Sequence, residues 1–173
     1  MAAMGIKKLT QLDLCSGVGV GFPLAGLCLK QFELIGLAEI DPYCCEILNH
    51  RYPGITNYGN IKSLAYDKLH EIPKAVDVIT ASPPCQPFSL EGKRQAAADD
   101  RDVFYEILHI VREKQPKFAV IENVPGLLTA PFAPGSKRIY FDYIQSRFKK
   151  DGYHIEKLRI GSGHVSAPFI RER

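Results

Sequence analysis

The sequence lacks the features that would place the protein in a membrane or in an oxidising compartment. No stretch approaches the roughly 20 consecutive apolar residues that a membrane-spanning helix needs, and the N-terminus has no secretory layout. The five cysteines form an odd set without a C-x-x-C pair, which argues against a disulfide framework and a structural zinc site. We therefore expect a cytoplasmic protein with reduced thiols and no bound metal.

Internal repeats, low-complexity tracts, Ser/Gly linkers and a strong net charge are also missing. The 173 residues, 46% hydrophobic and 24% charged, suit one globular domain with a packed core. The formal net charge is +3, but its distribution is uneven: residues 1–90 carry 7 basic and 8 acidic side chains, whereas residues 91–173 carry 15 and 11. This asymmetry mildly favours a polyanionic partner for the second half.

Apolar runs typical of strands alternate with segments of helical periodicity. The predicted strands are 9–14, 32–38, 76–81, 118–121 and 153–160, and the predicted helices are 22–30, 42–51, 102–113 and 138–150. Leu24, Leu27 and Cys28 share one side of the first helix, and the continuous apolar run 118–121 predicts a strand buried on both faces. The alternation predicts an α/β fold with an open, doubly wound, mostly parallel sheet. Ligands of such sheets bind beyond the carboxyl ends of the strands.

A glycine-rich turn follows the first predicted strand. Residues 13–22 read Asp-Leu-Cys-Ser-Gly-Val-Gly-Val-Gly-Phe, and alternate glycines let a backbone turn sharply and approach a ligand at a helix N-terminus. Glu39 follows the second strand, where a carboxylate can accept hydrogen bonds from a ribose. Together the two features favour an adenosine-type cofactor, although a plain tight turn and a solvated carboxylate remain open.

Cys85 lies in a proline-rich segment after the third predicted strand, Ser82-Pro-Pro-Cys-Gln-Pro-Phe-Ser89. Three prolines restrict the backbone and disfavour helix or sheet pairing, so the thiol is presented on a stiff loop. The other four cysteines are interpreted as small buried hydrophobes. The polar, basic segment 92–101 that follows is either a flap that closes over phosphates or an ordinary solvated loop.

Glu122 follows the fourth predicted strand directly. Partial desolvation at that position would raise the pKa of its carboxyl group and keep a proton available near neutral pH. At the C-terminus, Arg171 and Arg173 would project on one face of a strand and could bind an anion or a carbonyl oxygen. A frayed basic terminus explains the two arginines equally well.

These blocks, in this order, resemble the DNA cytosine-C5 methyltransferases over nearly the whole chain. Residues 13–22 look like the cofactor loop of that family, Pro84-Cys85-Gln86 like its nucleophile motif, and Glu122-Asn123-Val124 like its second catalytic motif. Residues 171–173 are similar to the end of its Q-x-R-x-R motif. The resemblance implies a Rossmann-like methyltransferase fold, S-adenosylmethionine as cofactor with S-adenosylhomocysteine as product, and double-stranded DNA as substrate.

The resemblance also implies residue roles. Cys85 would add to C6 of a flipped cytosine while Glu122 hydrogen-bonds N3, and Arg171 and Arg173 would contact cytosine O2 or the flipped phosphate. The expected cofactor residues are Asp13, Cys15, Ser16, Gly17, Gly19, Glu39, Ile40, Asn60, Ile61 and Pro83. The expected flap and DNA residues are Gln86, Ser89, Lys93 and Arg94.

Two positions depart from the family pattern. Asn60 stands where the family usually has an Asp facing the adenine amino group, so cofactor affinity is expected to be lower. Phe169 stands at the Gln of Q-x-R-x-R and cannot hydrogen-bond in its place.

The family continues beyond this motif with further strands, a target-recognition domain and a segment that completes the cofactor site. We therefore expect residues 1–173 to be a partial catalytic and cofactor-binding domain. Its target-recognition part would lie on a second polypeptide, as in split enzymes, or be missing through truncation. The alternatives are a tRNA cytosine-C5 methyltransferase and a cofactor-binding remnant without turnover; a nicotinamide-binding domain is a more distant fit.

Overall fold

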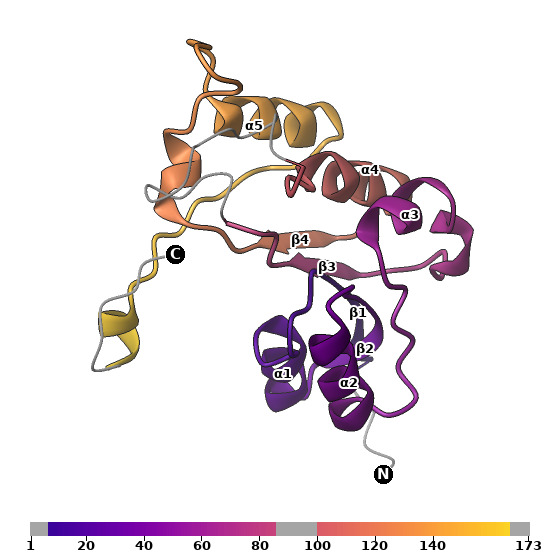
Figure 1. Cartoon of the computed structure of the whole chain (residues 1–173). Helices are drawn as coiled ribbons and strands as arrows, with labels where there is room; N and C mark the ends of the chain where they lie inside the picture. The colour runs from indigo at the N-terminus through magenta and orange to yellow at the C-terminus, as the bar shows by residue number, and fades with distance from the viewer. Residues whose placement is uncertain (1–6, 86–99, 167–173) are drawn as a thin grey trace. The chain divides into compact units, whose positions relative to one another are not determined.

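The computed structural model describes residues 7–85 and 100–166. Within these ranges the chain divides into two compact units (Figure 1). The first comprises the described residues of Met1–Ser82 together with His109–Ile121, and the second those of Pro83–Leu108 and Glu122–Arg173. The chain leaves the first unit directly after β3 (Val78–Ala81) and again directly after β4 (Phe118–Ile121).

The first unit contains a parallel four-stranded sheet in the order β2-β1-β3-β4. Its other two strands are β1 (Leu9–Leu14) and β2 (Phe32–Ala38). In the ladders, Leu14 pairs with both Ala38 and Ala81, and Ala81 pairs with Ile121. All four strands therefore end at the same edge, and the strand order reverses between β1 and β3, as expected for an open doubly wound sheet.

The helices follow the sequence pattern closely. The α-helices are α1 (Phe22–Leu29), α2 (Pro42–Arg51), α3 (Ile61–Tyr66), α4 (Phe104–Lys114) and α5 (Tyr140–Lys150), and the short 3-10 turns are Leu69–Glu71, Pro125–Leu128 and Ser162–Val165. Asp41 caps α2 by accepting from the Cys44 N–H at 2.9 Å, and Pro42 begins the helix. The predicted elements 9–14, 32–38, 42–51 and 118–121 are confirmed, and those at 22–30, 76–81, 102–113 and 138–150 are confirmed with ends shifted by one or two residues.

Helix α3 was not predicted from the sequence. Its buried residues Ile61, Leu64 and Ala65 recur at helical spacing, and the Asn60 side chain caps it by accepting from the Lys62 N–H at 2.8 Å. A six-residue helix holds too few apolar positions for periodicity alone to identify it.

The prediction that β4 is buried on both faces was wrong, and so was the burial expected for Cys28 in α1. In β4, Phe118 and Val120 share one face of the strand and are 59% and 45% exposed, so that face is not fully covered within the described residues. In α1, Pro23 and Gly26 face the core, whereas Leu24, Leu27 and Cys28 are exposed. A short apolar helix offers two candidate inner faces, and the glycine face is the one that fits against Gln11 of β1.

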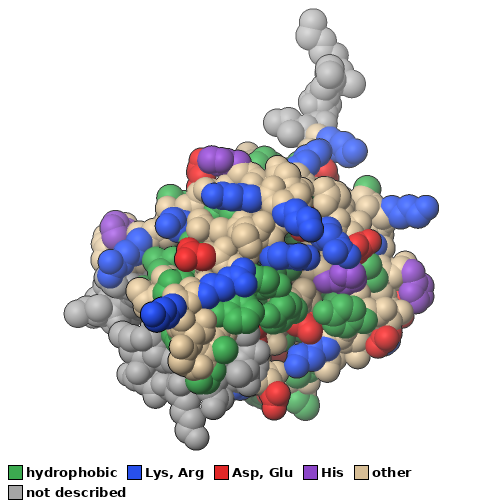
Figure 2. Space-filling model, turned by 90° about the horizontal axis from the view of Figure 1, so that it is seen from above, with side chains coloured by type: hydrophobic (Ala, Val, Ile, Leu, Met, Phe, Trp, Pro, Cys, Tyr) green, Lys and Arg blue, Asp and Glu red, His purple; other side chains and the backbone are tan. Residues whose placement is uncertain are grey.

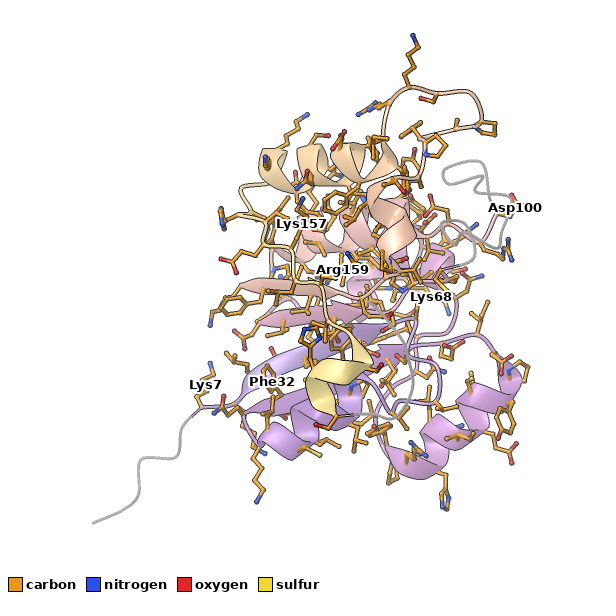
Figure 3. The ribbon with its side chains drawn as sticks, turned by 90° about the vertical axis from the view of Figure 1, so that its left-hand side faces the viewer. Lys7, Phe32, Lys68, Asp100, Lys157 and Arg159 are labelled. Carbon is orange, nitrogen blue, oxygen red and sulfur yellow. The ribbon has the colours of Figure 1, made fainter. Side chains whose placement is uncertain are left out.

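The predicted strand 153–160 does not form within the described chain. Its residues are mostly exposed and belong to no helix or strand, with no ladder partner in the sheet that the structure describes. Figure 3 labels Lys157 and Arg159 on this segment, and the Lys157 ammonium lies 5.3 Å from the ring centre of Phe141 in α5. Alternating exposure alone does not make a strand, because a strand also needs a neighbour for its backbone hydrogen bonds.

The Asp77 side chain, just before β3, contacts residues at the N-terminal ends of β1 and β4. Its carboxylate pairs with the Lys117 ammonium at 2.8 Å and accepts 3.0 Å hydrogen bonds from both the backbone N–H and the hydroxyl of Thr10. The Lys117 contact, followed by the Thr10 bonds, holds the pKa of Asp77 well below its usual value.

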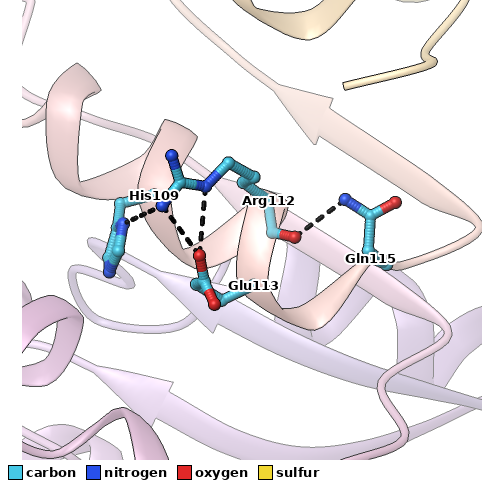
Figure 4. A network of polar contacts seen from close by, with 4 residues as sticks. All are labelled: His109, Arg112, Glu113 and Gln115. Atoms are coloured by element: carbon cyan, nitrogen blue, oxygen red, sulfur yellow. Dashed lines mark hydrogen bonds and ion pairs between the residues drawn. The ribbon is translucent and has the colours of Figure 1, made fainter. Parts of the chain in front are cut away.

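A second group of contacts surrounds His109 of α4. The Tyr66 ring stacks on the His109 ring, and the Arg112 side chain contacts both His109 and Glu113 (Figure 4).

An aromatic cluster forms the core of the second unit. Tyr140 is fully buried, packs edge-on against Phe104, and donates a hydrogen bond to the buried carboxylate of Asp102. The other oxygen of Asp102 accepts from the Phe104 N–H at 3.1 Å and so caps α4. The last turn of α5 carries Arg147, Lys149 and Lys150. Figure 2 shows several Lys and Arg side chains on the face that it draws.

Candidate cofactor and nucleophile site

The glycine-rich turn between β1 and α1 is held in shape by neighbouring elements. The Ser16 N–H donates to the Ala38 carbonyl at 3.2 Å, and the Gly19 N–H donates to the Ser16 carbonyl at 2.9 Å. From the end of α2, the Tyr52 hydroxyl donates to the carbonyl of Gly19. A backbone fixed at several points can present its groups to a ligand without further ordering.

Two glycines of this turn are required for different reasons. Gly19 has φ +74°, and an added Cβ would lie 2.5 Å from the Tyr52 ring, so both conformation and space exclude a side chain. Gly17 has φ +53°, but an added Cβ there would meet no atom within 4 Å. One side of the turn is therefore open, as close approach of a ligand to the backbone requires.

Glu39 lies half-buried beside the open glycine. One carboxylate oxygen accepts from the Gly17 N–H at 2.7 Å, and the other accepts from the N–H groups of Ile40 and Asp41 at 2.8 and 2.9 Å. A carboxylate offers about four acceptor positions. About one position therefore stays available for a ribose hydroxyl, and accepting both hydroxyls would require one of the backbone bonds to open.

Asp13 lies under the turn in a buried polar chain. Gln11 donates to the Thr80 hydroxyl at 3.1 Å, and Thr80 donates to the Asp13 carboxylate. Burial raises the pKa of Asp13 to about 6, although hydrogen bonds from Thr80 and Ser16 act in the opposite direction. Asp13 is only 2% exposed, so its side chain is buried beneath the glycine-rich turn and does not face solvent.

The other expected cofactor residues differ in accessibility. Ile40 is 64% exposed, which leaves an apolar surface beside Glu39, whereas Ile61 is 7% exposed and belongs to the core. The side-chain amide oxygen of Asn60 already accepts from the Lys62 N–H. Cys15 and Ser16 are half-buried, and Pro83 is buried in the second unit.

The expected catalytic residues Cys85 and Glu122 both belong to the second unit and are both half-buried. Cys85 follows β3 and Glu122 follows β4 in the chain. The last residues of these two strands, Ala81 and Ile121, are register partners. Asn123 next to Glu122 accepts from the Val124 N–H at 2.8 Å, while its buried amide nitrogen has no partner among the described residues. Arg171, Arg173, Gln86, Ser89, Lys93 and Arg94 lie outside the described residues.

The other cysteines are not the buried hydrophobes that the sequence predicted. Cys28 is exposed, and Cys15, Cys44 and Cys45 are half-buried. Cys45 instead donates to the Glu39 carbonyl at 3.3 Å. The contact between the Cys45 thiol and Glu39 was therefore missed from the sequence. Helix α2 brings the two residues together, and no motif in the sequence links them.

Asn57 is a second residue at Glu39 that the sequence did not indicate. It lies 18 positions further along the chain and pairs with Leu37 in an isolated parallel bridge. Its side chain hydrogen-bonds both backbone groups of Glu39. Only its position just before Gly59-Asn60 could have drawn attention to it.

Within the described residues no helix is both long and apolar enough to cross a membrane. In the same part of the chain no three His, Cys, Asp or Glu side chains gather in a way that could hold a metal ion.

Comparisons with known proteins give a consistent result. A family model described as C-5 cytosine-specific DNA methylase matches residues 9–173. The chain is 32% identical over 171 residues to the orphan methyltransferase M.SPRI of Bacillus phage SPR, covering 96% of this chain and 36% of the relative. It is 33% identical over 175 residues to the type II methyltransferase M1.HphI of Haemophilus parahaemolyticus, covering 96% and 44%.

Solved structures share the fold. The Dnmt2 methyltransferase of S. pombe superimposes with a TM-score of 0.72 at 24% identity, covering 95% of this chain and 49% of that one. The methyltransferase EhMeth of Entamoeba histolytica gives 0.69 at 19% identity, covering 96% and 51%. The chain thus spans less than half of these two curated relatives and about half of the two solved chains.

Proposed function

The chain belongs to the C-5 cytosine-specific DNA methylase family, and from this premise we propose that it is the catalytic part of an enzyme that methylates C5 of cytosine in DNA. One observation carries the proposal. Cys85 and Glu122 follow two adjacent parallel strands whose last residues, Ala81 and Ile121, are register partners. A nucleophile and a proton-holding carboxyl group near the carboxyl ends of neighbouring strands suit covalent chemistry on a planar base.

The turn at residues 15–21 and Glu39 fit S-adenosylmethionine, which supplies the methyl group when bound. Gly17 opens onto free space, Glu39 retains acceptor capacity for a ribose hydroxyl, and Ile40 offers an exposed apolar surface for the adenine. Asn60 can still accept a hydrogen bond from an adenine amino group through its remaining lone pair.

In the proposed reaction the thiolate of Cys85 forms a bond to C6 of cytosine, and Glu122 holds a proton at N3 to neutralise the charge that this addition creates. The electron pair thus made available at C5 would form the new bond to the methyl carbon while the bond from that carbon to the sulfonium sulfur breaks, with S-adenosylhomocysteine as the leaving group. Loss of the C5 proton and breakage of the bond between Cys85 and C6 then restore the ring. Arg171 and Arg173 are the proposed donors to cytosine O2 or to a phosphate.

DNA recognition is proposed to require a further part, on the same or on a second polypeptide. The support is that the chain spans 36% and 44% of the two curated relatives described above. A specific DNA interface typically buries about 1,000–2,500 Å² of protein surface, and the target base must leave the duplex before C6 can be reached.

The proposal is tested by transfer of a labelled methyl group to duplex DNA, with the full gene product and with any partner polypeptide added. Cys85→Ala should abolish transfer, while Cys28→Ala, which removes an exposed thiol in α1, should leave it unchanged. A duplex containing 5-fluorocytosine should form a covalent complex with the unaltered protein and not with Cys85→Ala. Transfer that persists in Cys85→Ala, or methylation of tRNA alone, contradicts the proposal.

A further inference from the structure

The end of strand β2 is held by a side chain from a distant part of the chain. Asn57 accepts a hydrogen bond from the Glu39 N–H at 3.0 Å and donates one to the Glu39 carbonyl at 3.1 Å. Its oxygen also accepts from the Gly59 N–H at 3.0 Å. The carboxamide of Asn57 therefore bonds both polar backbone groups of Glu39 at once.

The two hydrogen bonds from Asn57 take the place of backbone ladder bonds just beyond the end of β2. Strand β2 ends at Ala38, the register partner of Leu14, so the backbone of Glu39 lies beyond the last pair with β1. A half-buried backbone group without a partner costs free energy. The amide of Asn57 supplies the donor and the acceptor that a neighbouring strand would otherwise provide.

Cys45 completes the contacts of this backbone unit. Its thiol donates to the Glu39 carbonyl at 3.3 Å, and the Asn57 amide nitrogen lies 3.2 Å from its sulfur. The carbonyl of Glu39 thus receives two donors, one from α2 and one from the segment before α3.

We propose that Asn57 is a positioning residue that fixes the backbone of Glu39 and thereby sets its carboxylate for cofactor binding. The role in binding rests on the proposed function. The carboxylate reaches the Gly17 N–H at 2.7 Å, whereas the side-chain bonds of Asn57 described above go to Glu39, Gly59 and Cys45. Rotation of the Glu39 backbone would therefore move the carboxylate away from Gly17. Asn57 thus influences the glycine-rich turn indirectly, by holding the backbone of Glu39.

The residue type makes the proposal specific. Alanine removes the donor and the acceptor, whereas an ionised aspartate keeps the acceptor but places negative charge against the Glu39 carbonyl. A protonated aspartate regains one donor. The Glu39 carbonyl oxygen, which the Asn57 side chain faces, should raise the pKa of the aspartate that Asn57→Asp introduces, so the defect of this variant should diminish as the pH falls.

The first experiment measures the affinity of the full gene product for S-adenosylmethionine by isothermal titration calorimetry. Asn57→Ala should weaken binding about tenfold, as expected for loss of one or two hydrogen bonds at a partly buried backbone. Asn49→Ala, an exposed asparagine of α2, is the matched control and should bind as the unaltered protein does. Equal affinity of Asn57→Ala and the unaltered protein overturns the proposal.

The second experiment follows the same affinity between about pH 8 and about pH 5 for Asn57→Asp and for the unaltered protein. The ratio of the two affinities should approach one at the acid end, because the protonated aspartate regains a donor for the Glu39 carbonyl. A ratio that stays constant with pH shows that Asn57 acts only as a general structural residue and overturns the positioning role. This variant keeps the test decisive if Asn57→Ala fails to fold.

Amide hydrogen exchange without ligand supplies a third readout. Asn57→Ala should speed exchange at Gly17 as well as at Glu39 and Gly59, because Gly17 is bonded to Glu39. Faster exchange at Glu39 and Gly59 with unchanged protection of Gly17 overturns the proposal. If the unaltered protein does not bind S-adenosylmethionine, the proposed function fails and the binding role falls with it, an outcome distinct from equal binding by both proteins.

Discussion

The carboxylate of Glu39 accepts a hydrogen bond from the backbone N–H of Gly17 at 2.7 Å, and this bond joins the end of β2 to the glycine-rich turn after β1. The two residues are 22 positions apart in the chain. Because Gly17 faces open space, a ligand that approaches its backbone also meets Glu39. The pair therefore defines one corner of the proposed cofactor site.

Replacing Glu39 by glutamine should weaken binding of S-adenosylmethionine by about 10- to 100-fold, the usual range for hydrogen bonds to a charged group. Glutamine has only one acceptor oxygen, so its amide nitrogen would face an N–H donor. Titration calorimetry measures the affinity, and Glu33→Gln, an exposed position on the same strand, serves as the control. Equal affinities for all three proteins would remove Glu39 from the site.

Asp13 should make the protein less stable as the pH rises toward neutrality. Its pKa is about 6 in the folded state and 3.8 in the reference state, so the folded state binds the extra proton between these values and the free energy of unfolding falls as that proton is lost. The loss amounts to at most about 3 kcal/mol and is complete above about pH 6 to 7.

An asparagine at position 13 has no such proton but can still accept a hydrogen bond from Thr80. Urea unfolding from about pH 4 to about pH 7 should therefore show a smaller decline for Asp13→Asn than for the unaltered protein. Asp67→Asn, an exposed position after α3, should keep the full decline. Parallel curves for the Asp13 variant and the unaltered protein would show that Asp13 titrates normally.

The bond between Asp77 and Lys117 should contribute stability only while Asp77 is ionised. The folded-state pKa of Asp77 is depressed, so this stability is present above the ordinary pKa of an aspartate, about 4, and is lost as the pH falls below it. Asp77→Asn should lower the urea midpoint at neutral pH, and the difference from the unaltered protein should shrink in acid. A difference that does not change with pH would show that the charge of Asp77 adds nothing to stability.

Tyr140→Phe should destabilise the second unit by about 1–3 kcal/mol, because it removes a donor from the buried carboxylate of Asp102. The ring volume is kept, so packing against Phe104 should persist and the loss should report the hydroxyl. Urea unfolding gives the free energy, and Tyr43→Phe, at a 70% exposed position, is the control. Equal losses in the two variants would mean that the buried hydroxyl is not special.

Prediction from sequence succeeded where the information is local. The order of strands and helices from residue 9 to residue 51 follows from apolar periodicity and from Pro42 after Asp41, and α2 begins as this pair indicates. Cys85 and Glu122 were located by their position after strands. These features depend on neighbours within a few residues, which a sequence displays directly.

Burial and side-chain contacts were less predictable. Four apolar residues at 118–121 suit a central strand or an edge strand equally, and only the sheet order shows that β4 has a single described neighbour. The face of α1 that packs inward depends on Gly26 meeting Gln11 of β1. Neither fact follows from hydrophobicity, because each depends on what lies opposite.

By itself the sequence determined the class of fold, the turn that follows β1, and the positions of Glu39, Cys85 and Glu122 after their strands. The tertiary structure alone decided that Asn57 holds the backbone of Glu39 and that Thr80 hydrogen-bonds Asp13. These partners are separated by 18 and 67 residues. Such contacts arise because parallel strands bring distant segments to one edge of a sheet, and no pattern of adjacent residues records them.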